Sequence, residues 1–138
     1  MTRKNITISV VILLLLALST GAWYIFNKPH RSLEQAESIN VSADSLLASY
    51  LQNEIIANTK YLDKALVVNG EIAELNKNQS GQTVIILKTQ DPMAGVVCTM
   101  QKLPETELNI GQEVQVKGFC SGYISDVVLR DCQLTKEK

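Results

Sequence analysis

Hydrophobic residues follow two different patterns along this chain of 138 residues. Residues 6–26 form one dense apolar block without a charged side chain, whereas residues 65–134 alternate between apolar and polar positions in short runs. Alternation with a period of two predicts β-strands that have one buried face. The chain is therefore expected to hold an N-terminal apolar segment and one small β-domain.

Five strands are predicted in the alternating region, at residues 65–75, 83–89, 95–101, 114–118 and 126–132. Gly70 lies inside the first strand, where a glycine often marks a bulge or a sharp bend. The last two strands are predicted to form an antiparallel hairpin, because a glycine-containing turn at 119–122 separates two β-branched runs. The connection at 103–111 has room for no more than one helical turn.

A helix is predicted at residues 42–58, ahead of the strands. Ser42 can cap its N-terminus, Asp44 suits the positive end of the helix dipole, and Asn58 can end it. The residues that share one side at helical spacing are Leu47, Tyr50, Leu51, Glu54, Ile55 and Asn58. This stripe is apolar for two turns, so the helix is expected to pack over one end of the β-domain. Glu54 has no second carboxylate or histidine at a useful spacing, and we assign it no catalytic role.

The apolar block at 6–26 has the length of a transmembrane helix, because 21 helical residues span about 30 Å. Arg3 and Lys4 precede it, and aromatic residues at its far end suit a membrane interface. The alternative is a cleaved signal peptide with a small-residue site at 20–22, but the aromatic pair at 23–24 continues the apolar run. The pattern favours a retained signal anchor. It predicts a single-pass protein of the cell membrane whose domain faces the periplasm or the cell exterior.

The chain is expected to have five parts: a basic flank at 1–5, the anchor at 6–26, a tether at 27–41, the folded domain at 42–134 and a tail at 135–138. The only histidine, His30, lies in the polar tether, where a lone histidine is expected to be solvated.

Charge is divided unevenly between these parts. The whole chain has 13 basic and 14 acidic residues; without Arg3, Lys4 and Lys28, residues 29–138 hold 10 basic against 14 acidic, a net charge of −4. Proteins bind nucleic acid largely through lysines and arginines that displace counterions. The acidic balance therefore disfavours nucleic acid as the partner of this domain.

Several short motifs occur in a fixed order between Leu46 and Leu134. They are Tyr50, Asn53-Glu54, Ala57, Tyr61, Lys64, Val68-Asn69-Gly70, Val97-Cys98, Gly111, Val114, Val116, Gly118, Cys120-Ser121-Gly122 and Asp126-Val127-Val128-Leu129-Arg130-Asp131-Cys132. In this order and spacing the chain resembles the tRNA_anti-like family, a group of small bacterial OB-fold domains described as nucleic-acid-binding membrane proteins or lipoproteins.

The resemblance implies a mainly β fold, a five-stranded OB-fold barrel preceded by one packing α-helix. An OB-fold usually inserts a helix between its third and fourth strands, and the short connection at 103–111 departs from that pattern. The helix at 42–58 is expected to plug the barrel instead.

The OB-fold's usual binding surface consists of its second and third strands and the loops after its first and fourth strands. On that surface the candidate ligand residues are Lys77, Asn78, Lys88, Lys102 and Tyr123. Tyr123 is the only aromatic residue in the two loops, whereas binding of single strands needs several aromatic platforms as well as positive charge. The three lysines are also compatible with scattered surface charge.

Three cysteines, Cys98, Cys120 and Cys132, are the only reactive set in the chain. If the turn is centred near residues 122–124, the hairpin places Cys120 opposite about Asp126 and Cys132 near Val114. Six residues of strand then separate these two thiols by roughly 20 Å, too far for a disulfide unless the strand is strongly bulged. The third and fifth strands of an OB barrel are neighbours, which leaves Cys98 with Cys132 or with Cys120 as the possible pair. With no CxxC motif in the chain, we predict no metal site and no cofactor.

The sequence thus predicts a membrane-anchored extracytoplasmic binding or assembly module without catalytic activity, whose ligand is a protein or an envelope component. The first alternative is a protein that binds single-stranded nucleic acid. The second is a thiol-dependent enzyme that uses Cys98 or Cys120.

Overall fold

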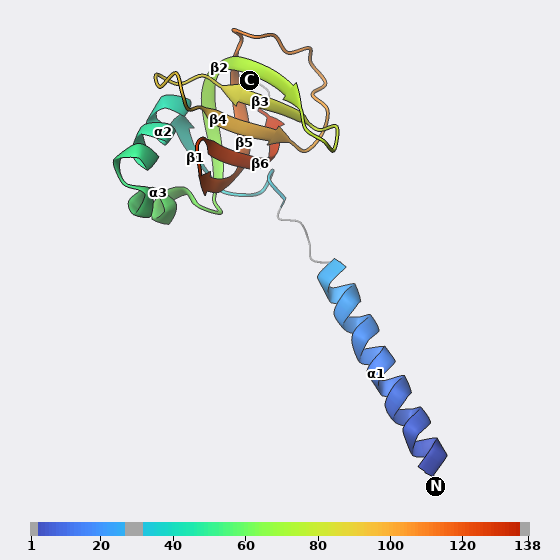
Figure 1. Cartoon of the computed structure of the whole chain (residues 1–138). Coiled ribbons are helices and arrows are strands. Elements are labelled where there is room, and N and C mark those ends of the chain that lie inside the picture. Colours follow the sequence, from blue (N-terminus) through green and yellow to red (C-terminus); the bar gives the residue numbers. More distant parts are fainter. Residues whose placement is uncertain (1–2, 27–31, 136–138) are drawn as a thin grey trace. The chain divides into compact units, whose positions relative to one another are not determined.

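The computed structural model describes residues 3–26 and 32–135 of the chain (Figure 1). The chain divides into two units, residues 1–32 and residues 33–138. The predicted basic flank, tether and tail fall in part on residues 1–2, 27–31 and 136–138, which lie outside the described residues.

The N-terminal unit contains one helix, α1 (Arg3–Phe26), which is 24 residues long. The large apolar side chains described on this helix, from Val10 to Tyr24, are between 52% and 69% exposed. Within the described part of the chain, no helix is both long and apolar enough to cross a membrane.

The second unit is built from six strands. They are β1 (Ser38–Ser42), β2 (Ala65–Lys77), β3 (Thr83–Leu87), β4 (Val96–Met100), β5 (Glu113–Tyr123) and β6 (Val127–Leu134). The strands lie in the order β1-β2-β3-β4-β6-β5, and β2 pairs with β5 as well. This last pairing closes β2 to β6 into a five-stranded barrel, in which only β4 and β6 run parallel. The predicted five-stranded barrel is confirmed, and its strand order is that of an OB-fold.

The sixth strand, β1, lies in the segment that the sequence predicted to be a tether. Its five residues run parallel to the first residues of β2, with Ile39 beside Leu66 and Val41 beside Val68. Ile39 and Val41 alternate with polar residues and pack against the core. This alternation is the signal of a strand, but it covers too few residues to stand out in the sequence.

The predicted helix at 42–58 is two helices, α2 (Ala43–Gln52) and α3 (Glu54–Tyr61). Ser42 caps α2 as predicted, by accepting a hydrogen bond from the backbone N–H of Ser45. Asn53 breaks the helix because its backbone is extended and its side chain caps α3. The predicted end at Asn58 is therefore wrong.

The break also changes which side chains face the barrel. Leu51 and Ile55 belong to the predicted apolar stripe, yet they are 53% and 80% exposed. Leu46, Leu47 and Tyr50 of α2 are buried in one core with the inward residues of the barrel strands. Each fully buried leucine contributes about 1.5–3 kcal/mol of hydrophobic stabilisation. The expected helical plug is thus provided mainly by α2, and Ala57 and Tyr61 of α3 are buried in the same core.

The hairpin of β5 and β6 turns later than the sequence predicted, at residues 124–126 instead of 119–122. Gly122 has a φ of 102°, and the register shifts between Cys120 and Gly122. The glycine therefore marks a bulge inside a long strand. Because the turn lies later in the chain, Cys120 pairs with Leu129, where we expected it opposite Asp126.

Gly70 also has a different role from the predicted bulge. The bulge in β2 lies at Ala73, between the pairs Ile72–Leu87 and Glu74–Ile86. A Cβ atom at position 70 would lie 3.1 Å from the Cβ of Ala43, at the start of α2. The missing side chain thus allows α2 to approach the barrel closely.

Candidate ligand-binding face

The predicted ligand residues do not form one site. Lys77 lies at one end of the ladder between β2 and β3, whereas Lys88 directly follows β3 at the other end. The five residues of β3 separate these two positions by roughly 16 Å. Lys102 lies beyond the end of β4, on the Lys77 side. The three lysines therefore do not make a continuous basic stripe.

Two of the predicted residues already have partners. The ammonium group of Lys88 lies 3.9 Å from Oε1 of Glu71. Oδ1 of Asn78 accepts hydrogen bonds from the backbone N–H groups of Ser80 and Gln82. Asn78 therefore organises the turn between β2 and β3 and is not free to contact a ligand with this oxygen.

Tyr123 is not available as a stacking platform either. Its ring stacks on that of Tyr50, with the ring centroids 5.9 Å apart and an interplanar angle of 24°. Tyr50 is buried in the core, and Tyr123 is half-buried against it. The one aromatic side chain that the sequence placed in the binding loops thus belongs to the packing of α2 on the barrel.

The outward side chains of β3 and β4, the usual OB-fold binding strands, and that of Val128 near the start of the neighbouring β6 are β-branched. We call this surface the β-branched face; it consists of Val84, Ile86, Val97, Thr99 and Val128. The residues that alternate with them along β3, β4 and β6 are fully buried in the barrel, so these five point outward and are partly exposed. Sequence reasoning missed this face, although its signal is present: the positions between the inward residues carry β-branched side chains where a solvated sheet usually carries charges.

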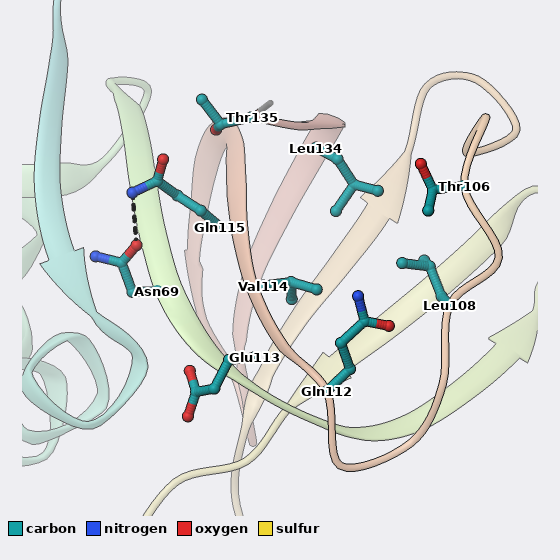
Figure 2. A pocket seen from close by; sticks show the side chains of 9 residues that line it. All are labelled: Asn69, Thr106, Leu108, Gln112, Glu113, Val114, Gln115, Leu134 and Thr135. Carbon is teal, nitrogen blue, oxygen red and sulfur yellow. Dashed lines mark hydrogen bonds between the residues drawn. The ribbon is translucent and has the colours of Figure 1, made fainter. Parts of the chain in front are cut away.

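A shallow groove lies between β5 and the connection from β4 to β5 (Figure 2), with a volume of about 400 Å³. Leu108, Val114 and Leu134 supply its apolar part. Polar side chains around them include Asn69 and Gln115, whose amides are joined by a hydrogen bond of 2.7 Å. Glu113 is the only charged residue that lines it. A groove lined in this way offers no cation for a phosphate group.

A second groove, of about 650 Å³, lies beside the loop that joins β3 to β4. We call it the acidic groove, because its lining includes four carboxylates and one ammonium group. The carboxylates are those of Glu71, Glu74, Asp91 and Asp126, and the ammonium group is that of Lys88. Its chemistry therefore favours a cation over an anion.

The three thiols are all buried and free. Contact with Cys132 and burial together raise the pKa of the Cys98 thiol. Cys120 lies instead beside Tyr50, with its sulfur 3.3 Å from the tyrosine oxygen, and burial followed by this contact raises the pKa of Tyr50. Of the two predicted pairs, the structure brings Cys98 and Cys132 together. A catalytic thiol must be accessible to its substrate, whereas Cys98 and Cys120, the residues of the thiol-enzyme alternative, are both buried.

Among residues 3–26 and 32–135, no group of three or more histidine, cysteine, aspartate or glutamate side chains is placed to hold a metal ion.

The closed five-stranded barrel with its parallel β4–β6 pair defines an OB-fold protein. The model of the tRNA_anti-like family matches residues 1–133, and the chain belongs to this family. No curated protein matches the chain.

Two solved structures are similar in fold. A crystal structure from Klebsiella pneumoniae subsp. pneumoniae, described as a "putative nucleic acid-binding lipoprotein", has a TM-score of 0.53 at 13% identity and covers 70% of this chain and 92% of that one. A "putative aspartyl-tRNA synthetase" from Leishmania major Friedlin has a TM-score of 0.42 at 12% identity over 80% of this chain and 23% of that one. At this identity the first similarity concerns the fold alone.

Proposed function

We propose that the barrel is a non-catalytic binding module that holds a protein partner on its β-branched face. The observation that supports this proposal is the chemistry of the outward positions. Ile86, Val97 and Val128 form one row across three neighbouring strands, without a charged or aromatic side chain among them. Apolar side chains in such a row lose contact with water when a protein surface covers them, which contributes about 25 cal/mol per Å².

Single-stranded nucleic acid is the second candidate, because the Klebsiella neighbour is described as nucleic-acid-binding. Such binding combines a basic groove with aromatic platforms on which bases stack. In this chain Tyr123 stacks on Tyr50, Lys88 is paired with Glu71, and the residues that line each of the two grooves described above carry a net negative charge. The surface chemistry therefore favours a protein as the partner.

A mobility-shift experiment separates the two candidates. We expect the full chain, in detergent, to leave single-stranded DNA and RNA oligonucleotides unshifted at physiological salt, because few cations are placed to release counterions. A shift that weakens steeply with salt would favour the second candidate. Loss of that shift in a variant carrying Lys77→Gln and Lys102→Gln would then identify the surface.

We also propose that α1 attaches the barrel to the cell membrane, with the barrel on the outer side. The exposed large apolar side chains described between Val10 and Tyr24 of α1 support this, because a helix with an apolar surface needs an apolar environment. Alkaline extraction of cell membranes tests the attachment. We expect the chain to stay in the membrane pellet, and its release into the supernatant would contradict the proposal.

A further inference from the structure

We propose that the acidic groove receives a lysine or arginine side chain from the protein segment that lies on the β-branched face. This inference rests on the proposed function, and it adds the chemistry of the partner.

The groove combines an apolar floor with an excess of negative charge. Ile86, Met93 and Ile110 contribute accessible apolar side chains to its lining, beside the four carboxylates and Lys88. Lys88 can balance only one of these carboxylates, and its nearest is that of Glu71, at 3.9 Å. A long side chain that is apolar along its stem and cationic at its tip fits this arrangement, because the stem covers the floor while the tip meets the carboxylates.

A neighbouring hollow extends the same acidic character. It shares Glu71 and Lys88 with the groove, and it adds the carboxylates of Asp44 and Glu113. The surface around the loop between β3 and β4 therefore carries more carboxylates than the groove alone. Such a field attracts a cationic partner before contact and weakens with added salt.

The loop that forms one wall is held in place by hydrogen bonds from three directions. Oδ1 of Asp44 accepts from the backbone N–H of Gln90 at 2.7 Å, and Oδ1 of Asp126 accepts from that of Gly95 at 2.7 Å. The hydroxyl group of Thr89 donates to carbonyl groups within the loop. A wall fixed in this way is ordered before a ligand arrives, so binding costs less conformational entropy.

The groove opens directly onto the β-branched face. Glu74 and Ile86 are paired across β2 and β3, and both line the groove, while Ile86 also belongs to the face. Met93 and Ile110 line the groove as well, and they are 87% and 68% exposed. A partner segment with alternating apolar and cationic side chains can therefore cover the face and fill the groove at the same time.

Two capped peptides of equal length test the proposal with the full chain in detergent. One alternates leucine with arginine, and the other alternates leucine with citrulline, which keeps the shape of arginine without its charge. We expect the arginine peptide to bind about tenfold more tightly at low salt, and the difference to shrink as salt is added. Fluorescence anisotropy of labelled peptides measures both affinities.

Matched variants separate the groove from the face. We expect Glu74→Lys to weaken the arginine peptide about tenfold and to leave the citrulline peptide unchanged, whereas Glu54→Lys on α3, with the same change of charge, leaves both unchanged. Val97→Asp on the face is expected to weaken the binding of both peptides. If this partly buried position does not tolerate a carboxylate and the variant does not fold, Val97→Thr is used in its place.

Each other outcome overturns a different statement. Equal affinity for the two peptides, with both lost in the Val97 variant, overturns the cation pocket and leaves the binding face standing. If the Val97 variants bind both peptides with unchanged affinity, the β-branched face is not the binding surface. The inference about the partner's chemistry is overturned if the arginine peptide does not bind at concentrations up to about 1 mM. It is also overturned if calcium chloride alone binds saturably and the Glu74→Lys variant loses that binding.

Discussion

Replacing Gly118 with alanine is expected to destabilise the protein by about 2–3 kcal/mol. Gly118 lies in β5, and a Cβ atom there would lie 2.5 Å from Sγ of Cys132 and 3.2 Å from the carbonyl oxygen of Arg130. Cys132 is fully buried, so its sulfur cannot move aside without disturbing the core. The shift of the urea midpoint, followed by far-ultraviolet circular dichroism of the full chain at unchanged m-value, measures the loss of stability.

A second substitution identifies the cause of this loss. Cys132→Ala removes the sulfur that Gly118→Ala meets, so the double variant is expected to be about 1–2 kcal/mol more stable than the sum of the two single losses predicts. Recovery is partial because the contact with the Arg130 carbonyl group remains. Strict additivity would show that the sulfur is not the obstacle, and would contradict the packing described here.

Replacing Leu46 with alanine is expected to cost about 3 kcal/mol, because it removes a fully buried side chain of α2 from the core it shares with the barrel. Leu51→Ala is the matched control. It makes the same chemical change on the same helix, at a residue that is 53% exposed, and is expected to cost about 0.5 kcal/mol. Thermal unfolding of the two variants compares them. Equal losses would contradict the assignment of α2 as the plug of the barrel.

The strands were predictable from the sequence because the barrel buries one face of each strand against the core. In β3, for example, buried Ile85 and Leu87 alternate with outward residues, which gives the period of two. The break between α2 and α3 was not predictable, because the apolar stripe continues past Asn53 as though the helix did. Asn53 ends α2 through its own extended backbone and the cap it gives to α3, whereas the sequence predicted the end of the helix at Asn58.

The hairpin register failed for a related reason. A glycine next to a serine is typical of a turn, and the sequence therefore predicted one at 119–122. In the structure Gly122 lies at a bulge, and the strand continues to Tyr123. Because the turn lies at residues 124–126, Cys120 is paired with Leu129 and not opposite Asp126, and the bulge changes this register by only one residue.

The candidate site was predictable only in part. The sequence located the binding strands through the resemblance to an OB-fold, but its five ligand residues were chosen by residue type. Whether Tyr123 is free or stacked on Tyr50 depends on a contact between residues that are far apart in the chain. The same holds for Lys88 and Glu71, which meet across two strands. The β-branched face could have been predicted from the sequence, because the alternation of inward and outward residues along β3 and β4 is enough to identify it.

Photo-crosslinking in intact cells tests the central claim most directly. A benzoylphenylalanine in place of Val97 sits on the β-branched face, and one in place of Glu54 on α3 is the control. We predict a discrete adduct from position 97 alone that protease destroys and nuclease leaves intact. An adduct that nuclease destroys, or equal adducts from the two positions, would contradict the claim that this face of the barrel holds a protein.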